Sequence, residues 1–239
     1  MTAMNLHRYP SPSGGVALGK IGARRTASVL PYDAEVEYLQ SMGIQWIDTG
    51  FIPQSLNFVW TTRCKFTADN GGLNGVTVSP SFSGKSRVGW GRNNFGVYPF
   101  YFGLGASNYN LNYQDKNWHT WKIDAVNQTG YIDAQSHSIP SNGWDPQVTS
   151  IKIFTSWRAV AEDAYLPAQE CVSSSVLEIN GVAVFDLIPV RFTNEQGQTE
   201  GAFFDRANPT VGMNPDGSAR TDGLYRNRGT GAFLYGNDI

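Results

Sequence analysis

Short segments in which apolar and polar residues alternate are the feature that most constrains how this chain can fold. Residues 57–66 show the pattern best, because apolar or small side chains occupy every second position and mostly polar ones lie between them. Successive side chains of an extended strand point to opposite faces, so this pattern predicts a strand with one buried face. The same period occurs in residues 33–38, 108–113 and 118–124, and further strands are expected at 130–134, 150–155, 176–180, 182–189 and 232–234.

Turn-forming residues separate these segments and indicate many short strands. The 239 residues include 26 glycines and 12 prolines, and charged residues make up 16%, against roughly 25% in an average globular domain. Asn180-Gly181 lies between two apolar segments, and Asn-Gly is the favoured sequence of a two-residue β-hairpin turn. The only helix-like stretch is a short one near Arg158–Tyr165. We therefore expect an all-β domain in which two antiparallel sheets pack against each other.

The first 31 residues differ from the rest in charge and in pattern. They contain four of the 18 basic residues and no acid, so the remaining chain holds 14 bases against 20 acids. They are rich in Gly, Pro and Ser and have no sustained hydrophobic period, which predicts an extended basic arm outside the core. The chain is thus expected to divide into an arm, 1–31, and one domain, 32–239. The arm residues expected to mediate assembly are Arg8, Tyr9, Leu18, Lys20, Ile21, Arg24 and Arg25.

Several compartments and partner classes are disfavoured by composition. The best candidate for the apolar core of a signal peptide, residues 16–23, is interrupted by Lys20 and followed by two arginines, so Sec export is not expected. No stretch approaches the 18 or more apolar residues of a membrane span, so no membrane insertion is expected. A net charge of −2 argues against nucleic acid as a partner of the whole chain. Cys64 and Cys171 are too few for a disulfide framework or a zinc site, and we expect both to stay reduced.

Four groups of motifs in residues 32–239 resemble a known family. They are EVEYLQS at 35–41 with QWIDTG at 45–50, NWHTWKID at 117–124 with GYID at 130–133, NGVAVFDLIPVR at 180–191, and GLY at 223–225 with GTGAF at 229–233. Together they resemble the concanavalin A-like (laminin-G-like) jelly-roll family, which is common in phage and gut-bacterial genomes. The resemblance implies a jelly-roll sandwich and a tendency to bind glycans or other proteins, but it supplies no reaction. Residues 194–222 form a longer link, richer in Gly, Asn and Asp, than is usual in that family.

Glycan binding needs exposed aromatic rings with polar groups beside them. Such residues gather in a loop-rich stretch that begins at residue 90, and next to two predicted turns. The candidates are Trp90, Arg92, Asn94, Tyr98, Trp144 and Trp157. Most aromatic residues of a sandwich lie in its core, so a core position is the alternative at each of them.

Catalytic and metal-binding patterns are weak. Asp33, Glu35 and Glu37 have the two-residue spacing of a glucanase carboxylate run, but a solvated strand face is the favoured interpretation. No Gly-x-Ser-x-Gly elbow occurs, and none of the three histidines has a nucleophile partner suggested by spacing. No cofactor is expected. Calcium is the alternative to ordinary turn chemistry in a Gly- and Pro-rich loop that contains Asp205, Asp216 and Asp222.

Three classes of function remain. The first is a phage virion structural protein (a capsid decoration, head-fibre or tail-associated subunit) made in the host cytoplasm and anchored by its arm. Its partners would be capsid or other virion proteins and further copies of itself, and its lectin-like jelly roll would face outward for adhesion to host-surface glycans. The second is a bacterial surface or secreted carbohydrate-binding module, and the third a glycoside hydrolase. The first class is favoured because a virion protein needs no export signal, and because an extended arm can become ordered on a neighbouring subunit. We expect a binding protein rather than an enzyme.

Overall fold

The computed structural model describes residues 30–68, 72–77, 87–92, 100–102, 105–107, 116–139, 149–158, 163–165 and 168–239. Within these ranges the chain is all-β and contains no helix, so none is present there that could cross a membrane. The expected all-β class is confirmed.

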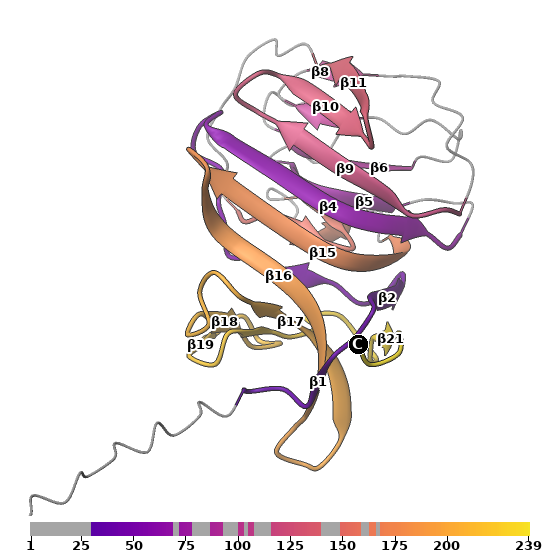
Figure 1. Cartoon of the computed structure of the whole chain (residues 1–239), viewed down its shortest axis with the longest axis vertical. Helices are drawn as coiled ribbons and strands as arrows, with labels where there is room; N and C mark the ends of the chain where they lie inside the picture. Colours follow the sequence, from indigo (N-terminus) through magenta and orange to yellow (C-terminus); the bar gives the residue numbers. More distant parts are fainter. Residues whose placement is uncertain are drawn as a thin grey trace, which may run out of the picture.

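The larger sheet contains 13 strands among the described residues (Figure 1). Its continuous path runs through β11 (Gln135–Ser138), β10 (Thr129–Ile132), β9 (His119–Asp124), β4 (Phe58–Phe66), β15 (Gln169–Ile179), β16 (Val182–Thr193), β17 (Thr199–Asp205), β20 (Leu224–Tyr225), β18 (Gly212–Met213) and β19 (Ala219–Arg220). Three short strands lie beside this path: β1 (Ala34–Glu35) on β16, β2 (Leu39–Met42) on β15, and β21 (Leu234–Tyr235) on β2.

The second sheet contains eight strands within the described ranges. Its path runs through β14 (Asp163–Tyr165), β13 (Ser156–Arg158), β5 (Gly72–Thr77), β6 (Arg87–Arg92), β7 (Phe100–Phe102) and β8 (Gly105–Ser107), with β12 (Lys152–Ile153) joining β5 to β3 (Ile47–Asp48). Strands β13 and β5 pair in parallel, as do β18 and β20, so the expectation of purely antiparallel sheets is wrong. In each pair the intervening chain, residues 78–155 and 214–223, returns the second strand in the same direction as the first.

The core lies between the two sheets, an arrangement consistent with a β-sandwich. Figure 1 shows β5 and β6 behind β4 and β9. The ring centroids of Trp60 on β4 and Trp90 on β6 are 3.9 Å apart, and both side chains are fully buried. On the same face of the larger sheet lie Phe58, Trp121 and Ile123. Each such side chain stabilises the fold by about 1.5–3 kcal/mol relative to leaving it in water.

The fold confirms two local predictions from the sequence and contradicts a third. The alternation predicted for residues 57–66 is confirmed in β4, whose even-numbered side chains are buried from Phe58 to Phe66. The hairpin at Asn180-Gly181 is confirmed between β15 and β16. The helix-like interpretation of Arg158–Tyr165 is wrong, because Asp163–Tyr165 is a strand paired with β13. Residues 108–113 lie outside the described residues.

The two cysteines face opposite ways. Cys64 lies on the inner face of β4, whereas Cys171 pairs in register with Lys65, whose side chain points outward. Both are buried free thiols. Burial is the main cause that raises the pKa of the Cys64 thiol well above its ordinary value, with the nearby Glu170 acting in the same direction.

Candidate functional site: an aromatic and basic cleft

The outer face of β4 carries two basic side chains beside each other. Thr62, Cys64 and Phe66 of this strand point into the core, so Arg63 and Lys65 between them point to the outside. Their strand lies in the middle of the larger sheet, between β9 and β15. A rigid central strand therefore holds both cations on the surface.

The neighbouring strands bring one aromatic residue to each side of this pair. On one side Cys64 pairs with His119, so the preceding Trp118 is the neighbour of Lys65. On the other side β15 separates β4 from β2, where Leu39 pairs with Val172, so Tyr38 is next to Ser173. Six residues line the resulting cleft of about 340 Å³, which we call the Tyr38–Trp118 cleft: Glu37, Tyr38, Arg63, Lys65, Trp118 and Ser173.

Cation–π contacts order the cleft. The rings of Tyr38 and Trp118 are 5.9 Å apart between centroids and inclined at 52°. The ammonium of Lys65 lies 5.3 Å from the Tyr38 centroid and 5.1 Å from that of Trp118. The guanidinium of Arg63 is 5.8 Å from the Trp118 centroid. Each contact of this kind contributes about 0.5–1 kcal/mol at an exposed site, which is enough to bias the positions of the long side chains.

The positive charge of the cleft is not neutralised internally. In the parts of the chain that the structure describes, no carboxylate lies within ion-pair distance of Arg63 or Lys65. The one acid in the lining is Glu37, whose carboxylate accepts hydrogen bonds from the backbone and side chain of Asn237 at 3.3 and 3.4 Å. Two cations and one acid give the cleft a positive balance within a domain that is acidic as a whole.

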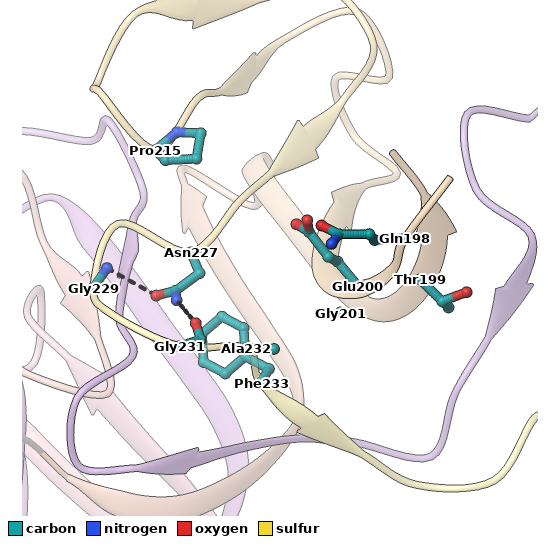
Figure 2. Close-up of a pocket in the computed structure, with 10 residues that line it drawn as sticks. All are labelled: Gln198, Thr199, Glu200, Gly201, Pro215, Asn227, Gly229, Gly231, Ala232 and Phe233. Atoms are coloured by element: carbon teal, nitrogen blue, oxygen red, sulfur yellow. Dashed lines mark hydrogen bonds between the residues drawn. The ribbon is translucent and has the colours of Figure 1, made fainter. Parts of the chain in front are cut away.

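A second, larger hollow of about 570 Å³ lies between the start of β17 and the loop that precedes β21 (Figure 2). Figure 2 shows Gln198 and Glu200 projecting from one wall and Asn227 from the other. The side-chain oxygen of Asn227 accepts from Trp46 and Gly229 at 3.0 and 2.8 Å, and its amide group donates to the Gly231 carbonyl at 2.6 Å. Because Asn227 is used in this way to hold its own loop, we interpret the hollow as a seam between elements.

A third hollow, of about 450 Å³, is mostly apolar. Phe51, Met213 and Tyr225 contribute to its walls, and no charged side chain is among its lining residues. Asn208, one of its few polar residues, donates through its side-chain amide to the Val184 carbonyl at 2.6 Å. Of the three hollows, only the Tyr38–Trp118 cleft combines aromatic rings with cations that have no carboxylate partner among the described residues.

The glycan-binding residues predicted from sequence are not brought together at this cleft. Trp90 is 0% exposed and packs on Trp60, so the expectation that it presents a solvent-facing ring is wrong, and the core alternative holds. The backbones of Arg92 and Trp157 belong to β6 and β13 in the second sheet. Outside the described residues lie Asn94, Tyr98 and Trp144, together with the arm residues Arg8, Tyr9, Leu18, Lys20, Ile21, Arg24 and Arg25.

The three carboxylates considered for calcium are held by hydrogen bonds from protein groups, and Asp216 and Asp222 are linked through Ser218, Asn214 and Arg220. Asp205 is fully buried and accepts the backbone N–H groups of Asp186 and Ala207, both at 2.9 Å. Asp216 accepts the N–H of Ser218 at 2.9 Å, and Asp222 accepts from the Arg220 side chain at 2.9 Å. No group of three metal-ligating side chains is found within the described ranges.

The acidic run at the start of the domain also has local partners. Asp33 accepts a hydrogen bond from the Thr193 hydroxyl at 2.8 Å, and Glu35 accepts one from the Tyr32 hydroxyl at 3.1 Å.

Close to the cleft, burial raises the pKa of Cys171 to about 11, although the charge of Lys65 opposes the shift. At neutral pH this thiol is therefore protonated and is a poor nucleophile.

Sequence reasoning missed Tyr38 and Trp118 as a pair, although one signal was present. Trp118 alternates in phase with Thr120 and Lys122, opposite to the buried Trp121 and Ile123, which places an aromatic ring on the polar face. Its partner is 80 positions earlier in the chain, and only strand order brings the two together.

In comparisons with known proteins, no family model, curated protein or solved structure matches the chain. The function must therefore be argued from the fold and the cleft themselves.

Proposed function

We propose that this chain is a non-enzymatic virion structural protein of a phage. In this proposal a concanavalin A-like jelly roll faces outward for adhesion to glycans, and residues 1–31 anchor it to capsid proteins or to neighbouring copies. The observation that carries the adhesive role is the Tyr38–Trp118 cleft, where two ring systems and two cations meet on the outer face of a rigid sheet.

The division of labour between arm and domain has support at the start of the described structure. The sheet hydrogen bonds of the described residues begin there with the N–H of Asp33, which donates to the Arg191 carbonyl at 2.8 Å. The next residues of the chain form β1, which pairs with β16. Among the described residues, the first hydrogen bonds of the larger sheet are therefore made within the domain, 32–239, itself. Four positive charges in the arm and an excess of acids in the domain suit the two parts to different surroundings.

The alternative function is a bacterial surface or secreted carbohydrate-binding module. The same cleft would serve it, so the arm is what separates the two proposals. A virion protein requires the arm for assembly, whereas a free binding module would keep its activity and its oligomeric state without it.

The test compares the full chain with a variant that lacks residues 1–31. We expect the shortened protein to keep its thermal unfolding temperature, because the described hydrogen bonds begin at Asp33. It should no longer join particles when produced together with the virion proteins, and it should sediment as a smaller species.

A charge variant provides the matched control. Replacing Arg8, Lys20, Arg24 and Arg25 by glutamine keeps the arm and its apolar residues, so it should slow assembly while leaving most of the final incorporation intact. Normal incorporation of the deletion variant would contradict the anchoring role, and so would a deletion variant that cannot fold.

A further inference from the structure

We infer that the Tyr38–Trp118 cleft binds the carboxylate of an acidic saccharide. The inference rests on the proposed adhesive function and specifies its ligand. Its basis is the combination of a positive local balance with aromatic rings, in a cleft whose size suits a short saccharide segment.

The two cations of the cleft have no ion-pair partner among the described residues. The domain holds more acids than bases, yet Arg63 and Lys65 lie together with no carboxylate at ion-pair distance in the described structure. Two other basic side chains of the surface have a carboxylate partner: Arg191 pairs with Asp238 at 2.7 Å, and Arg206 pairs with Asp186 at 2.9 Å. The Asp133 carboxylate interacts with Arg63 electrostatically but forms no ion pair with it, so a ligand carboxylate would supply the close counter-charge for Arg63 and Lys65 through charge-assisted hydrogen bonds.

The two aromatic rings of the cleft lie next to its lysine. Lys65 lies about 5 Å from the centroids of both Tyr38 and Trp118, so an anion bound to its ammonium is held beside two aromatic surfaces. Aromatic surfaces pack against the apolar C–H face of a sugar ring, while the Ser173 hydroxyl, which donates to the Arg63 carbonyl at 3.4 Å, can accept a hydrogen bond from its polar edge. An acidic saccharide presents a carboxylate, C–H faces and hydroxyls within one small unit, and this favours it over an acidic peptide.

The one acidic residue in the lining of the cleft is Glu37. Glu37 would repel a ligand carboxylate placed next to it, but its own carboxylate is turned to Asn237, which donates to it from the backbone and the side chain. The ligand carboxylate is therefore expected at the Arg63 and Lys65 side of the cleft. Hydroxyl groups, which can donate to Glu37, are expected at the opposite side.

The test uses the full chain and tri-galacturonic acid, with the methyl ester of the same trisaccharide as the neutral probe. We expect calorimetry to show binding of the acid at least about tenfold tighter than of the ester, because charge-assisted hydrogen bonds are the stronger class. Lys65→Gln should remove this preference. Added salt should weaken binding of the acid and leave binding of the ester unchanged.

Lys122→Gln is the matched control. Lys122 lies on the same outer face and its ammonium is 4.8 Å from the Tyr131 ring centroid, but it does not line the cleft. This variant should bind both probes as the unaltered chain does. Thermal unfolding of each variant shows whether it is folded.

The remaining outcomes separate the inference from the function on which it rests. Equal binding of acid and ester, lost in Trp118→Leu, would overturn the acidic ligand but retain glycan adhesion at the cleft. Tri-glutamate binding as tightly as tri-galacturonate would overturn the saccharide assignment. Trisaccharide binding that no cleft variant alters, or no binding at all, would contradict the inference, and failure to bind any glycan on a broad array would also remove the adhesive function.

Discussion

Asp48 is a charged residue that is almost entirely removed from water, with only 6% of its surface exposed. One of its carboxylate oxygens lies 2.8 Å from the ammonium of Lys152 and 2.7 Å from the guanidinium of Arg228. The other accepts the N–H of Gly50 at 3.0 Å and the hydroxyl of Ser150. Burial by itself would raise the pKa of Asp48, but the charge of Lys152 and these hydrogen bonds outweigh it, so the pKa lies below its usual value.

This cluster joins three separate parts of the chain. Asp48 and Lys152 are paired residues of β3 and β12, and Arg228 belongs to the loop before β21. Burial lowers the pKa of Lys152, although the Asp48 carboxylate acts in the opposite direction. Because both cations contact this buried carboxylate, removing it should cost more than removing an exposed partner.

We expect Asp48→Asn to lower the free energy of unfolding by about 3–5 kcal/mol at pH 7, since it removes the buried carboxylate that both cations contact. Urea denaturation measures the change. The pKa of Asp48 is lower in the folded than in the unfolded protein, so its contribution is complete above about pH 4 and is lost as the pH falls through the folded value. The difference between the variant and the unaltered chain should therefore shrink below about pH 4.

Asp186→Asn is the control for this prediction. Asp186 pairs with Arg206, whose side chain is more than half exposed, and such a pair contributes at most about 1 kcal/mol. A loss for Asp48→Asn as small as that for Asp186→Asn would show that the buried cluster is not a major source of stability.

At the scale of elements, the hairpin between β15 and β16 shows a turn whose residues match its geometry. Ile179 pairs with Val182, and the two residues between them, Asn180 and Gly181, have φ values of 52° and 75°. These are left-handed conformations that asparagine and glycine adopt most readily. A Cβ added at Gly181 would meet no atom within 4 Å, so only backbone strain opposes a side chain there.

Gly181→Ala should consequently lower the free energy of unfolding by about 1–2 kcal/mol, the cost of a left-handed conformation for a residue with a Cβ. Thermal or urea unfolding measures the loss. Gly181→Asn should lose less, because asparagine tolerates this conformation. If alanine and asparagine proved equally costly, strain in the turn would not be the cause.

The local elements could be predicted from sequence because a strand with one buried face has apolar residues at every second position. Phe58–Phe66 and the Asn180-Gly181 turn carry their geometry in adjacent residues. Strand neighbours are different: the parallel pairing of β13 with β5 depends on contacts across about 80 positions. The same limit applies to the candidate site, since Tyr38 and Trp118 become neighbours only through β15 and β4. Trp90, next to polar residues in the sequence, is buried because β6 faces Trp60.

At the scale of the whole molecule, the two ends of the described domain are joined next to the cleft. The N–H of Glu37 donates to the Asn237 carbonyl at 2.9 Å, and the N–H of Gly236 donates to the Tyr38 carbonyl at 3.1 Å. Figure 1 shows the C-terminus beside β21. Arg191 of β16 adds two 2.7 Å hydrogen bonds to the Asp238 carboxylate. The last residues of the chain thus hold the segment that presents Tyr38.

Removing residues 236–239 should therefore weaken the cleft without altering either of its cations. The amide hydrogen of Glu37 loses its acceptor, so it should exchange with solvent faster, and binding of tri-galacturonate should weaken because Tyr38 is less firmly held. Arg191→Gln is the control: it removes the surface ion pairs with Asp238 and Asp33 and keeps the backbone hydrogen bonds, so exchange at Glu37 and binding should both change little. Unchanged exchange and binding in the shortened chain would mean that β2 alone positions Tyr38.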